Sequence, residues 1–279
     1  MEDKSFKKSP ILYLVGTPIG NLEDISLRAL RILKEVSKIY CEDTRTSSVL
    51  LKHYDIKTPL ESYHNFNEEY KSKEIIEYLK EGHDAALISD AGNPIISDPG
   101  FKLVELANKS GISVRSILGP SAFTAAFMSS NMPMPFLFYG FLKPKTTERE
   151  KELAELKYYK ASLIFYEAPH RLKDTLNSIL KVLGDRDIYL GRELTKKFEE
   201  HYYLKTSELL KIADTLKGEM VLIVKGYEDD TFDEADRFKL IDEQISLGLK
   251  ANEAIKEVAK MLNTNKKELY KEYLEYKKN

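Results

Sequence analysis

Apolar and polar residues follow a regular order over roughly the first half of the chain. Short apolar runs predict buried strands at residues 11–15, 38–42, 85–89 and 113–118. Between them, apolar residues recur at helical spacing and predict helices at 25–37, 46–55, 68–82, 101–111 and 122–130. Strands that alternate with helices favour a parallel sheet with helices on both faces.

The pattern changes after the segment NMPMP at 131–135. Further strands are predicted at 136–142, 162–168, 187–194, 200–206 and 219–226, with helices at 147–159, 170–183 and 207–217. Two of these strands follow one another across a short turn near Thr195–Glu200, which favours a mixed sheet. We therefore predict an α/β protein with two α/β domains, the first with a mostly parallel sheet and the second with a mixed sheet.

The last part of the chain has no strand signal. The segment EDDTFDEAD at 228–236 is typical of an acidic linker, and three short amphipathic helices are predicted after it, at 237–248, 250–263 and 266–278. The predicted domain limits are 1–120 for the N-terminal domain, 121–228 for the second domain and 229–279 for a small C-terminal helical extension.

Composition narrows the class of protein. The chain has 279 residues, 42% hydrophobic and 32% charged, which is enough to bury a sizeable core. Its net charge of −2 gives no global basic field, so binding to nucleic acid would need local patches. The single cysteine, Cys41, excludes an intramolecular disulfide. With no signal-peptide pattern and no apolar run of membrane length, we expect a cytoplasmic protein with no membrane partner.

Three Gly- and Pro-rich loops, at 16–21, 90–100 and 119–121, follow predicted strands. Ligands of open parallel sheets bind beyond the carboxyl ends of the strands, so these loops are candidate binding loops. The first, GTPIGN, lacks both the glycine pattern of dinucleotide-binding loops and the lysine of a phosphate-binding P-loop. A tight strand-to-helix connection explains it equally well.

The second loop, DAGNPIISDPG, admits several interpretations. Asp90 and Asp98 have no further ligand at metal-binding spacing, so we predict no metal site. Gly92 permits a backbone conformation with positive φ and Pro94 stiffens the loop, which suits backbone hydrogen bonding to an amino acid or nucleoside. Asp98 is expected to cap and start the next helix, which makes Asp90 the better functional candidate.

Polar side chains gather after other predicted strands. Glu42, Asp43 and Arg45 in CEDTRTS form either an acid/base group or a self-satisfied ion pair. His64 and Glu68 in YHNFNEE suit a helix cap or a polar substrate pocket.

Taken together, these segments resemble one family. LVGTPIGNLEDISLRAL, CEDTRTS, HNFNE, ISDAGNPIISDPG, LGPSA, FYEAPHRL, RELTKKFEE and GEMVLIV follow one another between about residue 11 and residue 226. In this order they resemble the ribosomal RNA small subunit methyltransferase I family. That family is a branch of the tetrapyrrole methylase superfamily, the class III S-adenosylmethionine (SAM)-dependent methyltransferases.

The resemblance implies a function, a cofactor and an assembly. It implies SAM-dependent 2′-O-methylation of a cytidine ribose in the decoding region of small-subunit (16S) rRNA, with the small ribosomal subunit as partner. It also implies a homodimer, with the cofactor in a cleft between the two α/β domains. The implied cofactor-binding residues are Asp90, Ala91, Gly92, Pro94, Ile95, Ser121, Ala122, Tyr166, Glu167, Leu194, Met220 and Val221.

Removing the ribose hydroxyl proton calls for a general base. The candidates for this base are Glu42, Asp43, His64 and Glu68, and the sequence does not single out one of them. Arg45 is a candidate for binding a phosphate or a developing alkoxide. RNA contacts are expected from local cations, namely Arg28, Arg31, Arg171, Arg192, Lys196, Lys197 and the lysines of the C-terminal extension. Two alternatives remain open: a small-molecule methylase acting on a tetrapyrrole, and a non-catalytic RNA-binding protein of ribosome assembly.

Overall fold

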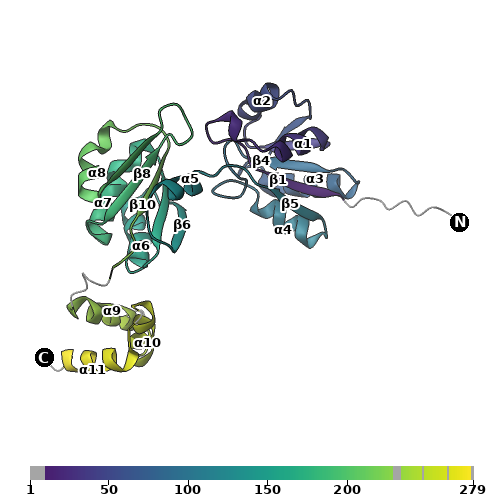
Figure 1. Cartoon of the computed structure of the whole chain (residues 1–279). Helices are drawn as coiled ribbons and strands as arrows, with labels where there is room; N and C mark the ends of the chain where they lie inside the picture. Colours follow the sequence, from purple (N-terminus) through teal and green to yellow (C-terminus); the bar gives the residue numbers. More distant parts are fainter. Residues whose placement is uncertain (1–9, 229–233, 247, 263, 278–279) are drawn as a thin grey trace. The chain divides into compact units, whose positions relative to one another are not determined.

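A computed structural model describes residues 10–228, 234–246, 248–262 and 264–277 (Figure 1). Contacts between Cα atoms divide the chain into two compact units. The first unit contains residues 1–130, 190–201 and 218–221, and the second contains 131–189, 202–217 and 222–279. The domain limits drawn from the sequence, at 120 and 228, stay a prediction.

The first unit is built on a five-stranded sheet with the order β3-β2-β4-β1-β5. All neighbouring strands of this sheet are parallel, as predicted. Its strands are β1 (Ile11–Val15), β2 (Lys38–Cys41), β3 (Leu60–Ser62), β4 (Ala85–Ile88) and β5 (Ser113–Ile117). The apolar pattern did not predict β3, because this edge strand has three residues and none is fully buried.

Helices cover both faces of this sheet. α1 (Leu27–Glu35) and α2 (Thr44–His53) pack on one face, where their apolar residues share a core with Tyr13, Ile39 and Ile88 of the strands. α3 (Glu68–Lys80) and α4 (Phe101–Lys109) pack on the other face against Leu12 and Leu87 (Figure 1). Adjacent strand residues thus point to opposite cores, as the pleat requires. A short 3-10 helix, η1 (Leu22–Asp24), precedes α1, and α5 (Ala122–Ser129) follows β5.

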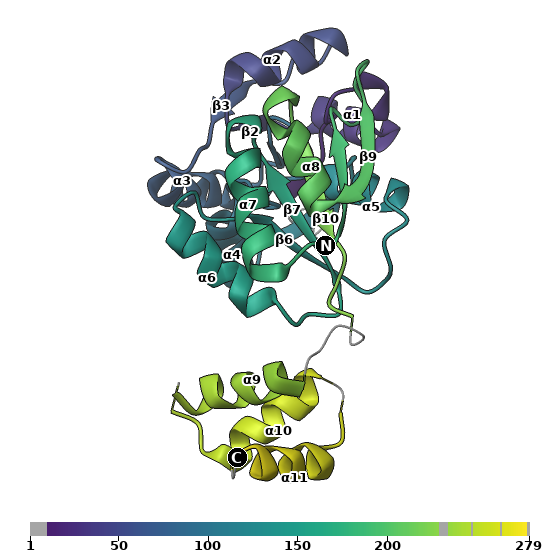
Figure 2. The same cartoon turned by 90° about the vertical axis from the view of Figure 1, so that its left-hand side faces the viewer.

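The second sheet is mixed and has the order β6-β7-β10-β8-β9. Its strands are β6 (Phe136–Phe141), β7 (Ser162–Glu167), β8 (Asp187–Arg192), β9 (Glu200–Lys205) and β10 (Met220–Val224). Figure 2 shows α6 (Thr146–Leu156), α7 (Leu172–Leu183) and α8 (Thr206–Ile212) lying over one face of this sheet. The predicted helix at 170–183 begins as a 3-10 turn at Pro169–Arg171, before α7. The predicted fold class, two α/β sheets followed by helices, is confirmed.

The C-terminal part forms three helices, α9 (Glu234–Ser246), α10 (Ala251–Met261) and α11 (Lys266–Tyr276). Their own apolar core includes Ile241, Ile255, Val258 and Leu269. Residues 229–233 of the predicted acidic linker lie outside the described residues, and α9 already begins within the remainder of that segment. Among the helices described, none has the length and apolar character needed to cross a membrane.

Candidate active site

All five strands of the first sheet end at the same edge, because the sheet is parallel. The loops that follow them bring Thr17 (after β1), Glu42 (after β2), His64 (after β3), Asp90 (after β4) and Gly119 (after β5) to that edge. This is the edge at which parallel sheets bind ligands. Residues separated by more than seventy positions in the sequence therefore meet here.

Three of these loops are joined to one another. Thr17 and Gly92 exchange backbone hydrogen bonds of 2.8 and 3.1 Å, and the Thr17 hydroxyl donates to the Ser89 carbonyl at 3.1 Å. Asn93 binds the third loop, because its Nδ2 donates to the Pro120 carbonyl at 3.0 Å and its Oδ1 accepts the Gly119 N–H at 3.1 Å. The GTPIGN loop and the loop after β5 are therefore both tied to the loop after β4.

The loop after β4 is held in an unusual backbone conformation. Gly92 has a φ of 79°, and two non-glycine residues, Ile95 and Ser97, have φ values of 77° and 68°. Such conformations cost free energy and are enriched at ligand-binding loops. The N–H groups of Ala91 and Ile95 donate no hydrogen bond to any described residue. This loop therefore offers free backbone donors, which fits recognition of an amino acid or nucleoside moiety.

A cluster of carboxylates lies at the same edge. Asp90 Oδ1 accepts the Asp43 N–H at 3.2 Å, and Glu42, Asp90 and Asp98 interact electrostatically. Burial, and then the charges of Glu42 and Asp90, raise the pKa of Asp98 from 3.8 to about 6. Burial is also the main cause of the raised pKa values of Glu42 and Asp90. None of the three carboxylates pairs with a lysine or arginine within the described ranges, so the cluster suits a cationic ligand or a proton.

Asp98 is not the helix cap that the sequence suggested. The N-cap of α4 is Gly100, and no side chain of the cap residue bonds to the helix. Instead, Oε1 of Glu68 accepts the N–H groups of Gly100 and Lys102 at 3.1 and 3.4 Å, and the Tyr63 hydroxyl at 3.0 Å. Glu68 thus has a structural role at the start of α4, and Asp98 is left in the carboxylate cluster. Only the fold places Asp98 beside Glu42, so no local sequence signal indicated this neighbour.

Asp43 and Arg45 form the ion pair that the sequence left open. Asp43 caps α2 by accepting the Arg45 N–H at 2.8 Å, and it binds the Arg45 guanidinium through both oxygens, the shortest contact being 2.7 Å. The hydrogen bonds from Arg45 lower the pKa of Asp43 from 3.8 to about 2. Asp43 is therefore a poor proton acceptor near neutral pH. The Arg45 side chain is 90% exposed and remains accessible to a phosphate.

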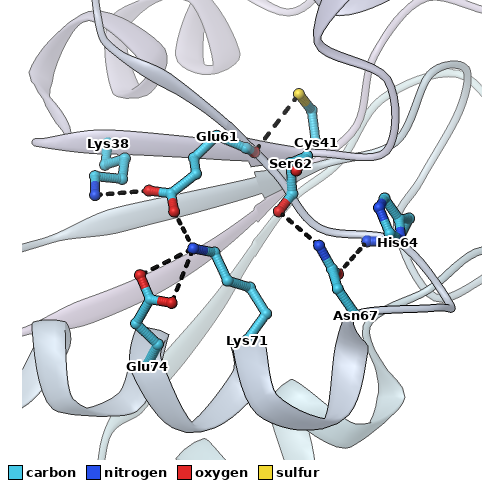
Figure 3. Close-up of polar contacts among 8 residues, drawn as sticks. All are labelled: Lys38, Cys41, Glu61, Ser62, His64, Asn67, Lys71 and Glu74. Carbon is cyan, nitrogen blue, oxygen red and sulfur yellow. Dashed lines mark hydrogen bonds and ion pairs between the residues drawn. The ribbon is translucent and has the colours of Figure 1, made fainter.

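His64 lies where β3 ends, and two polar contacts fix its backbone. The His64 N–H donates to Oδ1 of Asn67 at 2.9 Å, and Nδ2 of Asn67 donates to the Ser62 carbonyl at 3.2 Å (Figure 3). The ring nitrogen Nδ1 of His64 is buried and has no hydrogen-bond partner among the described residues. Its interaction with Glu42 places His64 on the border of the carboxylate cluster.

The strand that carries His64 is anchored by a charge network. Lys71 of α3 is 5% exposed and pairs with Glu61 of β3 and, at 2.9 Å, with Glu74. Glu61 also pairs with Lys38 of β2 at 2.7 Å (Figure 3). Burial alone would lower the pKa of Lys71, but its bonds to Glu61 and Glu74 outweigh burial and raise that pKa. The network ties an edge strand with few apolar contacts to α3 and β2.

We expect Lys71→Met to lower the free energy of unfolding by about 2 kcal/mol, because it leaves a partly buried Glu61 with Lys38 alone. Urea unfolding at pH 7 measures the change. The matched control is Lys80→Met on the same helix, since Lys80 pairs with Glu77 in an exposed position and its loss should cost well under about 1 kcal/mol. Equal losses in the two variants would contradict a role of the network in holding β3.

The other predicted cofactor residues are divided between the two units. The first unit contains Ser121, the N-cap of α5, with Ala122 after it, and the buried side chains of Leu194, Met220 and Val221. In the second unit, Tyr166 packs edge-on against Phe138 and Phe141 at 5.0 and 5.5 Å. The buried Glu167 accepts the Ala168 N–H at 2.8 Å and the Thr175 hydroxyl, so its carboxylate is used within its own unit. Whether these residues bind a cofactor stays a prediction.

Among the residues that the structure describes, no group of three or more His, Cys, Asp or Glu side chains is arranged to hold a metal ion. The carboxylate cluster and the strained loop are thus the chemically distinctive features of this edge. Cys41 is a poor nucleophile, because it is buried and burial raises the pKa of its thiol.

Comparison with known proteins identifies the family. Residues 11–210 match the model of the tetrapyrrole (corrin/porphyrin) methylases. The chain is 45% identical over 273 residues to the ribosomal RNA small subunit methyltransferase I of Bacillus subtilis strain 168, covering 94% of each chain. It is 49% identical over 214 residues to the protein of that name from Mycoplasmopsis pulmonis, covering 76% of this chain and 96% of the relative.

Solved structures show the same fold at low sequence identity. Diphthine synthase superposes with a TM-score of 0.61 and 14% identity, covering 78% of this chain and 90% of the enzyme. Uroporphyrin-III-C-methyltransferase from Thermus thermophilus superposes with a TM-score of 0.58 and 19% identity, covering 77% and 94%. This chain is a methyltransferase that belongs to the tetrapyrrole methylase family, within its ribosomal RNA small subunit methyltransferase I branch.

Proposed function

We propose that this protein transfers a methyl group from SAM to the 2′-oxygen of a cytidine ribose in the decoding region of small-subunit rRNA. The observation that carries the proposal is the uncompensated carboxylate cluster of Glu42, Asp90 and Asp98 beside a strained binding loop, in a chain whose relatives are named for small-subunit rRNA methylation. A tetrapyrrole substrate is less well supported, because the 45% identical relative bears the rRNA name, while the tetrapyrrole enzymes match at 19% identity or less.

The residues at the sheet edge fit the cofactor by shape and by charge. The free N–H groups of Ala91 and Ile95 suit its polar ends, and the negative cluster suits a positively charged sulfonium. When bound, SAM supplies an activated methyl group with a neutral leaving group. We propose Asp90, Ala91, Gly92, Pro94 and Ile95 as its main binding loop. Ser121, Ala122, Tyr166, Glu167, Leu194, Met220 and Val221 are proposed as further contacts.

Proton removal is assigned to the carboxylate cluster. A general base works best when its pKa lies near the operating pH, and Asp98, with a pKa of about 6, meets this condition. Glu42 has a raised pKa as well, and we propose that it shares the proton with Asp98. Asp43, held by Arg45, and Glu68, at the start of α4, are proposed to position the loops.

Local cations are proposed to hold the RNA backbone. Several of the candidates already have protein partners: Arg31 pairs with Glu35, Arg192 with Glu200, and Lys196 with Glu193 and Glu219. Arg28 has no ion-pair partner in the part of the chain that the structure describes, and Lys197 contacts the ring of Phe198. Arg28, Lys197 and Arg45 are therefore the cations most available for phosphates. We also propose that the protein forms a homodimer.

A methyl-transfer assay tests the function directly. The full chain and labelled SAM are incubated in parallel with small ribosomal subunits, free rRNA and a tetrapyrrole precursor, and the modified nucleotide is mapped as a 2′-O-methylcytidine. Transfer to rRNA at a ribose supports the proposal. Transfer to the tetrapyrrole, or to a base of the RNA, would contradict it.

The C-terminal helices are proposed to be an accessory element. Residues 234–277 contain nine Lys and Arg and nine Asp and Glu residues, so they create no basic field. The relative from Mycoplasmopsis pulmonis is shorter than this chain, since 214 matched residues make up 96% of it. Both observations favour catalysis that does not depend on these helices.

We expect deletion of residues 229–279 to change the KM for small subunits less than about tenfold and to leave the affinity for SAM unchanged. Methylation kinetics and titration calorimetry measure these values, with sedimentation to record the oligomeric state. A large loss of RNA affinity in a folded, correctly assembled truncation would show that the helices bind RNA. Loss of a dimer would assign them to assembly instead.

A further inference from the structure

Three large aromatic side chains are exposed close to the candidate active site. Phe66 is 99% exposed, Phe101 72% and Tyr70 62%. Phe66 lies in the loop between β3 and α3, Tyr70 lies in the first turn of α3, and Phe101 is the first residue of α4. We refer to Phe66, Tyr70 and Phe101 as the aromatic patch.

Contacts between the two helix starts hold the members of this patch together. Glu68 Oε1 accepts the N–H groups on both sides of Phe101, those of Gly100 and Lys102. Glu69, next to Tyr70, pairs with Lys102 at 3.4 Å. The first turns of α3 and α4 therefore lie side by side, with Tyr70 on the first, Phe101 on the second and Phe66 in the loop just before α3.

The patch is continuous with the candidate active site. The ring of Phe66 meets the ring of His64 edge-on, with 6.0 Å between centroids. His64 in turn interacts with Glu42 of the carboxylate cluster. A nucleotide bound on Phe66 would thus neighbour the reacting ribose rather than a distant surface.

Packing within the chain gives no reason for these side chains. A phenylalanine that is 99% exposed contributes almost nothing to a core. Exposed apolar side chains scattered singly are normal, whereas a group of them is typical of an interaction surface. Unpaired bases of RNA stack on exposed aromatic rings, and this stacking contributes to affinity with little dependence on which base is bound.

We propose that the aromatic patch binds single-stranded rRNA next to the methylated nucleotide, with one base stacked on Phe66. This inference rests on the proposed function, and it assigns the aromatic patch as a surface that positions the RNA substrate. The bound RNA must be locally unpaired, because a stacked base must leave its helix.

The absence of tryptophan from the sequence permits a direct test. Phe66→Trp places a single tryptophan at the patch, and excitation at about 295 nm selects its fluorescence over that of the tyrosines; Tyr78→Trp, near the other end of α3, is the matched control. Titration with a single-stranded oligoribonucleotide should saturably quench the fluorescence of the Phe66→Trp protein and leave that of the Tyr78→Trp protein unchanged. In methylation assays with small subunits, Phe66→Ala should raise KM about 5- to 100-fold with little change in kcat. Phe66→Tyr, which keeps an aromatic ring, should have a KM near the wild-type value.

The outcomes separate this inference from the proposed function. If the wild-type protein methylates rRNA while Phe66→Ala keeps its KM and RNA does not quench the Phe66→Trp protein, the stacking surface is wrong and the function stands. If the wild type methylates no rRNA, the function is wrong, and the oligonucleotide titration still decides whether the patch binds RNA. Quenching of the Phe66→Trp protein by ribosomal proteins but not by RNA would assign the patch to a protein partner and overturn the inference.

Discussion

Asp98→Asn is expected to lower kcat by about 10²- to 10⁴-fold, the usual contribution of a general base. Asparagine keeps the shape of the side chain but cannot accept the proton of the ribose hydroxyl. In the wild type, kcat/KM should fall as the pH drops through about 6, because the carboxylate becomes protonated there. The variant should lose this step in its pH profile.

The same change should stabilise the folded protein at neutral pH. The pKa of Asp98 rises from 3.8 to about 6 on folding, so the ionised carboxylate is disfavoured in the folded state above pH 6. A neutral amide removes this cost, which for a partly solvated group is about 1–3 kcal/mol. The advantage of Asp98→Asn should shrink as the pH falls from 6 towards 4, because Asp98 is then neutral in the folded state.

Urea unfolding and steady-state kinetics across pH 4–8 test both effects in one variant. Asp55→Asn, at a position paired loosely with Lys57 at 3.7 Å in a highly exposed loop, provides the control and should alter neither quantity. An Asp98→Asn protein that methylates at the wild-type rate would eliminate Asp98 as the base. An inactive variant with lowered stability would point to a structural role.

Gly16→Ala should weaken SAM binding about 100-fold or more. A Cβ atom at residue 16 would lie 2.4 Å from Oδ1 of Asn93 and 2.5 Å from the backbone N of Gly119. Both atoms belong to the junction of the three binding loops, which Asn93 holds through its bonds to Gly119 and Pro120. The backbone of Gly119 and the hydrogen-bonded side chain of Asn93 leave no space for a methyl group at residue 16. The loops that carry these residues must therefore move apart in the Gly16→Ala protein.

Gly20→Ala is the matched control in the same GTPIGN loop. There the new Cβ would meet side-chain atoms only, Cγ of Lys196 at 2.4 Å and Oγ1 of Thr195 at 3.0 Å, and no backbone of another binding loop. We expect Gly20→Ala to change SAM affinity less than about fivefold. Titration calorimetry with SAM measures both variants, and circular dichroism checks that each is folded. Similar affinities in the two variants would refute the importance of the loop junction.

The sequence predicted most of the fold because its periodicity is local. The strand at 85–89 and the helix at 101–111 appear as β4 and α4, with ends that differ by one or two residues. The apolar pattern did not predict β3, because ion pairs of Glu61 with Lys38 and Lys71 hold this strand against β2 and α3. Such ion pairs leave no apolar periodicity in the sequence.

Some residues of the candidate site were recognisable from the sequence, and others only from the fold. Asp90, Gly92 and Glu42 were recognisable from loop position and from the family's motifs. Asp98 was judged from its neighbours Pro99 and Gly100, which do mark a helix start, yet the capping is done by Glu68, thirty positions earlier in the chain. A side chain that caps a helix from another segment leaves no local signal.

By itself, the sequence determined the order of strands and helices, the candidate binding loops at the strand ends and the methylase family, because each of these rests on neighbouring residues. Only the tertiary structure decided which acids share a site and which have structural roles. It gathered Glu42, Asp90 and Asp98 without a lysine or arginine partner among the residues that the structure describes, paired Asp43 with Arg45, and placed Glu68 at the start of α4. The physical reason is that burial and Coulomb interactions depend on distance in space, which the fold alone defines.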